Sequence, residues 1–380
     1  MNSDERRAAR RKRREEKRAK KRAERIKDCT LENVANLDNL FNAAKEASKG
    51  INWKASTQRY MQNQLRNVAK ARRELLNGDD VSRGFINFSI YERGKRRDIS
   101  AVHFSERPIQ KSLTKNALTP AIEPTLIHSN TANRKGMGTH HAIKLLKKQL
   151  AKHYRKHGAE GYILQVDFEN YFASIEHEPV KDLIRKSLDD PRIIELVCSM
   201  IDTQGDTGLG LGSEPNQVLA VALPSPIDHF VTECCEVEAY GRYMDDSYAI
   251  HTSKEHLQLV LGCIEVKANQ LGIKLNRKKT HIVKLSHGFV FLKKKFSYGE
   301  NGKVVIRPCR DSITRVRRKM RKLADMEKRG EITPEQAARA YQSSRGSMQH
   351  WDAYRTVRAL DAHYKALRCN KNNSRGGFSD

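Results

Sequence analysis

Two adjacent carboxylates, Asp245 and Asp246, are the residues of this sequence best suited to chemistry. They lie in the stretch 239–250, between Tyr243-Met244 and an apolar continuation that ends at Ile250. Such a pattern predicts a β-hairpin whose tight turn exposes both acids to solvent. Because neighbouring carboxylates repel each other, a functional pair needs a cation, and Mg²⁺ prefers the oxygen ligands that they offer.

An acidic surface turn is the competing interpretation of the pair, since Asp favours turns for local hydrogen-bonding reasons. A functional interpretation therefore needs further chemical groups elsewhere in the chain. The first is Asp167, which follows a short apolar strand expected at 162–166 and precedes a turn toward a helix. A carboxylate at the end of a strand is a common position for metal chemistry.

Glycines and basic residues form further candidate sites. The glycine-rich segment 208–217 precedes a helix expected at 218–231, and its glycines permit a ligand to approach the backbone closely. Arg134 and Lys135 precede a helix that runs to Leu150, and such a helix start can hold phosphate; a solvated loop is the alternative. A basic turn at 272–280 follows a helix expected at 254–271.

The remaining elements expected from the pattern are a mixture of helices and strands. Two helical patterns occupy 31–77, and Gly78 ends the second. A further helix is expected at about 108–123. Strands are expected at 85–91, 99–102, 288–292 and 304–306, with a basic turn at 94–97. The chain is helical and basic from 312, with helices at 334–343 and 348–367.

The charge of the chain indicates a polyanionic partner. Its 380 residues include 72 Lys and Arg against 45 Asp and Glu, a formal net charge of +27. Nucleic acid is the first expectation and an anionic membrane the second. No apolar run approaches the roughly 18 residues that span a bilayer, and the N-terminal segment is not typical of a secretory signal. The seven scattered cysteines indicate neither a zinc site nor a disulfide framework and fit a reducing, cytoplasmic compartment.

The basic N-terminal segment, residues 6–27, alternates Arg and Lys with Ala and Glu. These are good helix formers without an apolar stripe, so a helix here has no core on which to pack. We expect a mobile arm that becomes ordered on RNA or DNA, and a solubilising tail is the alternative.

The order of these features resembles that of bacterial reverse transcriptases, over roughly residues 35–365. The stretch Tyr243-Met244-Asp245-Asp246 is similar to their motif C, and Asp167 with Phe168 and Phe172 is similar to motif A. Among these enzymes the sequence is most similar to the reverse transcriptases of diversity-generating retroelements. That likeness is carried by the segment 134–140 and by Leu211-Gly212 with Gln217, where Asn216 replaces the expected Ser. Defence-associated reverse transcriptases share much of this pattern.

The resemblance implies an α+β fold, the right-hand polymerase with fingers, palm and thumb. Its implied divisions are a basic N-terminal arm (1–30), N-terminal helices and fingers (31–160), palm (161–298), helical thumb (299–368) and a flexible tail (369–380). A primer grip is expected at Gly288, Phe289, Phe291 and Leu292.

The resemblance also implies roles for single residues. Asp167 and Asp245 would bridge two Mg²⁺ ions, for which Mn²⁺ can substitute, with Asp246 assisting and the carbonyl of Phe168 completing one shell. Lys279 would donate a proton to the leaving pyrophosphate, although a lone lysine is as readily a solvated one. The nucleotide-binding residues would be Arg97 and Arg134 at the triphosphate, Phe172 under the sugar, and Gly212 and Gln217 under the template base. A core aromatic is the alternative for Phe172.

These expectations describe an RNA-directed DNA polymerase whose partners are an RNA template, a DNA or RNA primer and dNTPs. A structured noncoding RNA and a small basic accessory protein are further candidate partners, and no membrane is expected. A non-catalytic, maturase-like RNA-binding protein and a two-metal nuclease are the alternatives. The presence of all three carboxylates argues against the first, and the lack of a nuclease-like His/Asn/Cys cluster at the C-terminal end argues against the second. Primer identity, and a retroelement as against an antiviral defence role, stay open.

Overall fold

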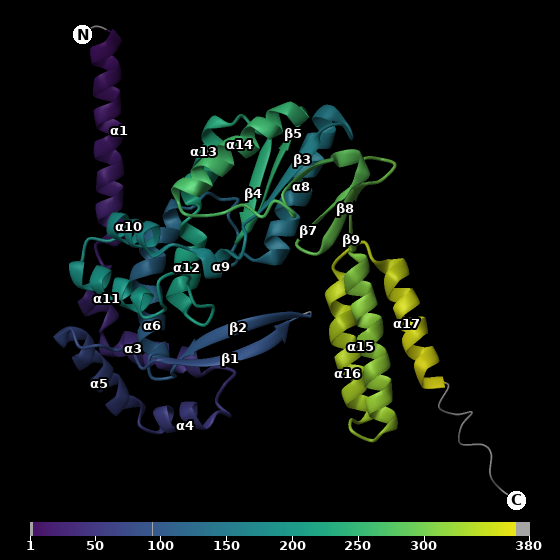
Figure 1. Ribbon diagram of the computed structural model, residues 1–380, viewed down its shortest axis with the longest axis horizontal. Coiled ribbons are helices and arrows are strands. Elements are labelled where there is room, and N and C mark those ends of the chain that lie inside the picture. Colours follow the sequence, from purple (N-terminus) through teal and green to yellow (C-terminus); the bar gives the residue numbers. More distant parts are fainter. Residues whose placement is uncertain (1–2, 93, 370–380) are drawn as a thin grey trace, which may run out of the picture. The chain divides into compact units, whose positions relative to one another are not determined.

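The computed structural model describes residues 3–92 and 94–369, shown in Figure 1. Two compact units are present: unit 1 comprises 1–138, 166–248 and 258–280, and unit 2 comprises 139–165, 249–257 and 281–380. The tail predicted at 369–380 lies outside the described residues from 370 onward.

Unit 1 is mainly helical. Its helices are α1 (Ser3–Ile26), α2 (Leu31–Val34), α3 (Leu37–Ser48), α4 (Ala55–Gln62), α5 (Gln64–Asn77), α6 (Arg107–Leu113), α7 (Thr119–Ile122), α9 (Tyr171–Ser174), α10 (His177–Ser187), α11 (Pro191–Asp202), α12 (Glu214–Ala222), α13 (Ser225–Cys234) and most of α14 (Lys254–Gln270). A π-helical turn, Thr114–Leu118, joins α6 to α7, and a 3₁₀ turn, Glu123–Thr125, follows α7. The core of this unit includes Leu40 of α3 and Leu113 of α6, both fully buried.

Three differences from the expected helices of unit 1 have local causes. The two patterns of 31–77 form four helices, α2 to α5, and Gly78 closes the last with a left-handed φ of 75°. The helix expected at 218–231 is two helices, because the first ends before Pro224 and the next begins at Ser225. The helix expected at 108–123 is interrupted by the π-helical turn.

The strands of unit 1 include a two-stranded hairpin, β1 (Phe85–Glu92) and β2 (Lys95–Val102), which pair antiparallel from Phe85↔Val102 to Glu92↔Lys95. Residue 93, in the turn between them, is outside the described residues. A four-stranded sheet has the order β4-β5-β3-β6, with β4 (Ala239–Tyr243), β5 (Asp246–His251), β3 (Tyr162–Asp167) and β6 (His281–Lys284). β3 and β5 each contribute residues to both units.

Unit 2 contains α8 (Thr139–His157), a three-stranded antiparallel sheet and three C-terminal helices. The sheet has the order β7 (Phe289–Phe291), β8 (Lys294–Tyr298) and β9 (Val304–Pro308), after a 3₁₀ turn at Leu285–His287. The helices α15 (Arg310–Lys328), α16 (Pro334–Gln349) and α17 (Tyr354–Cys369) lie side by side (Figure 1) around a core of Met320, Tyr341, Met348 and Leu360. In the described residues, none of the helices has the length and apolar character needed to cross a bilayer.

Candidate active site

Asp167 ends strand β3 and is 5% exposed. The segment 274–280 runs beside it: the N–H of Asn276 donates to the carbonyl of Asp167 at 2.8 Å, and the N–H of Glu169 donates to the carbonyl of Lys274 at 2.8 Å. These backbone bonds bring the basic turn predicted at 272–280 next to the acid. The Lys279 ammonium then donates to both carboxylate oxygens of Asp167, at 2.8 and 2.6 Å.

Asp245 lies with Met244 in the tight turn predicted between two strands, here β4 and β5, and Asp246 begins β5. Met244 holds this turn with a φ of 57°, in the left-handed region that non-glycine residues seldom adopt. Strained backbone of this kind concentrates at functional sites. The sequence analysis placed both acids in solvent, and that expectation is wrong: each is only partly exposed.

The side chains of Asp246 and Asp167 lie within hydrogen-bonding reach of each other. Burial first, and then the neighbouring charges of Asp245 and Asp167, raise the pKa of Asp246 to about 7. Partial burial opposes the charge of Lys279, but its hydrogen bonds to Asp167 and the nearby carboxylates raise its pKa overall. Three acids from two separate parts of the chain therefore converge in unit 1, with one ammonium among them.

Arg242 holds the Asp-Asp turn in place, a role that was not predicted from the sequence. Its side chain is 1% exposed and makes a bidentate pair with the fully buried Asp228 of α13, with Nε–Oδ1 at 2.8 Å and Nη2–Oδ2 at 2.7 Å. The same guanidinium donates to the carbonyl of Met244 at 2.9 Å and to that of Val221 at 2.7 Å. Although burial alone would lower the pKa of Arg242, Asp228 raises it, so the ion pair is retained.

Further contacts surround this ion pair. The hydroxyl of Tyr240 donates to Asp228 at 2.8 Å. The backbone of Arg242 pairs with the segment 129–131: its N–H donates to Ser129 and its carbonyl accepts from Thr131, both at 3.1 Å. A signal for this network was present in the sequence, because Asp228 is an acid within an otherwise apolar helical stretch.

A second hydrogen-bond network, also not predicted from the sequence, shapes the glycine-rich loop. The amide of Asn216 donates to Oε1 of Gln204 at 2.8 Å and to the carbonyl of Gly210 at 3.1 Å. The N–H of Gly210 donates to the same Gln204 oxygen. Asn216, which differs from the Ser of the resembled motif, therefore braces the loop that precedes α12.

Phe172 and the glycine-rich loop line a groove of about 380 Å³ in unit 1. Asn87, Asp98 and Ser100 of the β1–β2 hairpin line its other side. Gly212 contacts that hairpin directly, because a Cβ at this position would overlap the backbone carbonyl of Ser100. Gln217 is half-buried on α12, and the Phe168 ring is buried 5.3 Å from that of Tyr171.

Arg97 and Arg134 were predicted to bind the triphosphate. In the part of the chain that the structure describes, no contact of either arginine joins it to the three acids. Arg134 donates to Glu123 at 3.3 Å and to the carbonyls of Ile127 and Asn130 at 3.1 and 2.8 Å. These partners hold the loop 123–134 and use the Nε and Nη1 groups of Arg134. Arg97 pairs with Ile90 in the hairpin, and its side chain lies outside the described residues.

The predicted primer-grip residues form the first strand of the three-stranded sheet of unit 2. Gly288 has a φ of 69°, and a Cβ there would lie 2.7 Å from the Phe296 carbonyl. The rings of Phe289 and Phe296 stack at 5.3 Å. Leu292, with a φ of 44°, and Lys293, with 62°, form the two-residue turn into β8. This strand β8 was not among the predicted elements.

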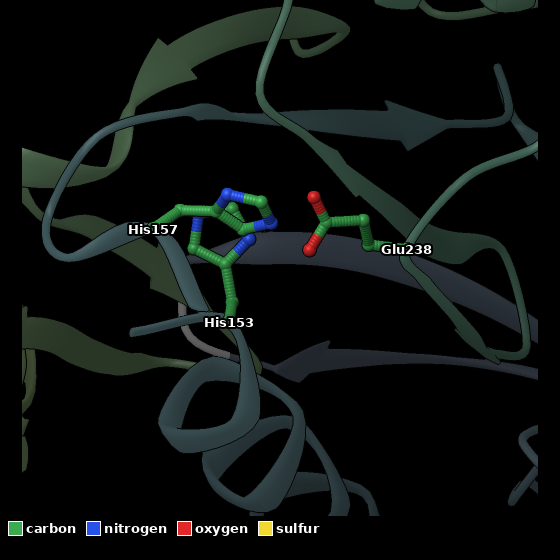
Figure 2. A group of neighbouring side chains, drawn as sticks. All are labelled: His153, His157 and Glu238. Atoms are coloured by element: carbon green, nitrogen blue, oxygen red, sulfur yellow. The ribbon is translucent and has the colours of Figure 1, made fainter. Parts of the chain in front are cut away.

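A pair of histidines in unit 2 has a structural role. Figure 2 shows the rings of His153 and His157, one turn apart on α8, with centroids 5.1 Å apart. The Nε2 of His153 lies 2.6 Å from the carbonyl oxygen of Glu160, to which it donates. A Cβ at Gly161 would meet the His153 ring at 2.8 Å, so the ring packs against the start of β3.

The donor set at the three acids fits divalent cations. Carboxylate oxygens are the ligands that Mg²⁺ prefers, and the charges of Asp245 and Asp167, which after burial raise the pKa of Asp246, are charges that bound cations would offset. Asp167, Asp245 and Asp246 are the residues that would hold them.

Comparisons with known structures and with curated proteins do not by themselves identify the family of this chain. No curated protein matches the chain. A structure of apo telomerase from Candida tropicalis, truncated from its C-terminal domain, aligns with a TM-score of 0.44 and 15% identity over 59% of this chain and 55% of that one. Telomerase from Candida albicans, in complex with a fragment of telomeric RNA, aligns with a TM-score of 0.46 and 10% identity over 74% of this chain and 54% of that one. The chain thus spans about half the length of these structures.

A family comparison is decisive. Residues 87–298, more than half of the chain, match the model described as "Reverse transcriptase (RNA-dependent DNA polymerase)". This match confirms the family and the α+β right-hand polymerase fold predicted from the sequence, and its description agrees with the predicted enzyme class. The chain belongs to the reverse transcriptase family.

Proposed function

We propose that this chain is an RNA-directed DNA polymerase that synthesises cDNA on an RNA template. The observation that carries the proposal is the convergence of Asp167 with the Asp245-Asp246 turn, beside Lys279. Neither a solvated surface turn nor an RNA-binding relic of the fold needs three carboxylates to converge at a partly buried site, where burial and then the neighbouring charges raise the pKa of Asp246 to about 7.

The proposed reaction is nucleotidyl transfer. Asp167 and Asp245 would hold two divalent cations, Mg²⁺ or Mn²⁺, with Asp246 assisting and the Phe168 carbonyl completing one shell. When bound, such ions activate the primer 3′-hydroxyl and neutralise the triphosphate and its leaving oxygens. Lys279, whose raised pKa keeps it protonated at neutral pH, would donate a proton to the leaving pyrophosphate.

Substrate selection is proposed for the groove lined by Phe172 and the glycine-rich loop. Phe172 would pack against the sugar and exclude a 2′-hydroxyl, so that dNTPs are preferred to rNTPs. Gly212 and Gln217 would lie under the template base, and Arg97 and Arg134 would contact the triphosphate. Phe289 and its neighbours from Gly288 to Leu292 would contact the primer.

The proposed setting is a bacterial diversity-generating retroelement, on the basis of Leu211 and Gly212 in the loop before α12 and of Gln217 on α12. A defence reverse transcriptase that works with a noncoding RNA is the alternative. Sequencing the cDNA made by the purified protein on its co-purifying RNA distinguishes the two, because frequent misincorporation favours the retroelement and faithful copying of one noncoding RNA favours defence.

Replacement of Asp167 by Asn tests the polymerase. We expect Asp167→Asn to abolish extension of a primer on an RNA template with Mg²⁺ and dNTPs, because one carboxylate of the cation site is lost, while RNA binding stays within about twofold. Asp182→Asn on the exposed face of α10 is the matched control and should retain full extension. Extension by Asp167→Asn at the parental rate would refute the assignment.

A further inference from the structure

Helix α1 is long and almost wholly exposed. Between Asp4 and Lys21 none of its residues is buried, and only its C-terminal end packs on the rest of unit 1. There Arg22 makes a bidentate pair with Asp189, at 2.6 and 3.1 Å, and Ile26 is 6% exposed. Figure 1 shows α1 extending from unit 1 as a straight helix. It is therefore fastened at one end and presents its side chains to a partner.

The helical conformation of α1 gathers most of its basic residues on one face, an arrangement that was not predicted from the sequence. At 3.6 residues per turn, the basic residues gather on roughly half of the helix circumference. This basic face is formed by Arg6, Arg7, Arg10, Arg11, Arg13, Arg14, Lys17, Arg18, Lys20 and Lys21. The opposite half carries Ala8, Ala9 and Ala19 with Glu5, Glu15 and Glu16, and one base, Lys12.

The basic face repels itself in the absence of a partner. Like charges four residues apart, such as Arg10 and Arg14, or Lys17 and Lys21, lie next to each other on a helix and destabilise it. An exposed helix has no core to offset this repulsion. A polyanion that neutralises the face would remove it, so the charge pattern is complementary to a row of phosphates.

The distribution of charge around α1 indicates which kind of polyanion it binds. A helix that lies on a membrane needs large apolar residues opposite its charges, and the opposite half of α1 has only Ala and Glu. Cations spread over half of a helix can instead meet phosphates on both walls of a nucleic-acid groove. We propose that the basic face of α1 binds the phosphate backbone of a double-stranded nucleic acid, separate from the template and primer. This extends the proposed function without depending on the polymerase reaction.

The test measures binding of a fluorescein-labelled, blunt RNA hairpin to the full chain, with the template site saturated by an unlabelled RNA–DNA hybrid. The test variant carries Arg10→Gln, Arg14→Gln, Lys17→Gln and Lys21→Gln. Gln is a good helix former, so α1 should stay helical by circular dichroism. The control carries Arg59→Gln, Arg66→Gln, Lys70→Gln and Arg73→Gln, four exposed charges on α4 and α5.

We expect hairpin affinity at physiological salt to fall about tenfold or more in the test variant and less than about twofold in the control. The slope of log K against log salt should fall by about 3 to 4 in the test variant. Primer extension should be unchanged in both, which separates this inference from the proposed function. Equal losses in the two variants, undiminished hairpin binding by the test variant, or a loss seen only with phosphatidylserine vesicles would each overturn it.

Discussion

At the scale of single residues, Arg242 links the fold to the candidate chemistry. Its guanidinium donates hydrogen bonds to the Asp228 carboxylate and to the carbonyls of Val221 and Met244. The bond to Met244 fixes the strained turn that carries Asp245 and Asp246. Removing one partner of a buried ion pair costs about 3–5 kcal/mol, so a substitution that deletes the charge would endanger the fold. A lysine keeps the charge but cannot reproduce the fork of contacts.

We therefore expect Arg242→Lys to lower kcat for dNTP incorporation by about 10–100-fold, because the acids move out of position, with a much smaller change in KM for dNTP. The concentration of Mg²⁺ that gives half-maximal activity should rise, which a general loss of stability would not cause. Tyr240→Phe, which removes one hydroxyl from the same network, should show a smaller change in the same direction.

Arg345 of α16 provides the control, because it also pairs with an aspartate, Asp361, but belongs to the helices of unit 2. Arg345→Lys should leave the Mg²⁺ dependence unchanged. An unchanged Mg²⁺ dependence in Arg242→Lys, together with reduced kcat, would show that the arginine has no positioning role.

At the scale of elements, the contact between the glycine-rich loop and strand β2 depends on the lack of a Cβ atom at Gly212. A Cβ at Gly212 would overlap the backbone at Ser100, and backbone cannot move aside as a flexible side chain can. The loop and the hairpin both line the groove beside Phe172. Separating them would therefore change the shape of the proposed nucleotide site.

We expect Gly212→Ala to destabilise the chain by about 1–3 kcal/mol through overpacking and to reduce primer extension by more than this loss of folded protein explains. Gly262 of α14 is the matched control, because no atom lies within 4 Å of a Cβ placed there. Gly262→Ala should stabilise the chain by about 0.5–1 kcal/mol in urea titrations and leave extension unchanged. Normal extension by Gly212→Ala would mean that the loop and hairpin need not touch.

At the scale of the whole molecule, the convergence of acids should make stability depend on pH and on divalent cations. Burial and the neighbouring carboxylates raise the pKa of Asp246 from its usual value of 3.8 to about 7, so the folded state binds its proton more tightly than the unfolded state does. Charged Asp246 thus destabilises the fold above pH 7, and this effect disappears as the pH falls through 7 toward 4.

In EDTA, we expect Asp246→Asn to be more stable than the parental chain at pH 8, with the difference in melting temperature shrinking toward pH 5. Excess Mg²⁺ should reduce the difference at pH 8, because bound cations offset the same repulsion. Asp182→Asn, at an exposed site, should show no such trend. A constant difference between Asp246→Asn and the parental chain from pH 5 to 8 would contradict the expected repulsion.

The sequence predicted the elements whose patterns are local. The Asp-Asp turn, the strand before Asp167, the strand at 85–91 and the helix boundary at Gly78 all follow from alternation, periodicity and turn chemistry. The turn expected at 94–97 lies mostly within β2, which begins at Lys95. The family, too, could be recognised from the motifs around Asp167 and Asp245.

What the sequence could not predict depends on contacts between distant residues. The Arg242–Asp228 pair, the Gln204–Asn216 brace and the contact of Gly212 with β2 join positions that no periodicity relates. The exposure of Asp246 was mispredicted for the same reason, because a turn that is polar in sequence can fold against another strand end. Arg134 likewise has partners, Glu123 and two carbonyls, that its motif did not reveal.

The pairing of Arg242 with the segment 129–131 affects more than the local turn. β4 is at one end of the order β4-β5-β3-β6, where a strand normally offers unpaired N–H and C=O groups to any other chain that can add to the sheet. At Arg242 both of these backbone groups are already bonded, to Ser129 and Thr131. At this position of β4, close to the acidic turn, the backbone is therefore not available for the addition of another strand.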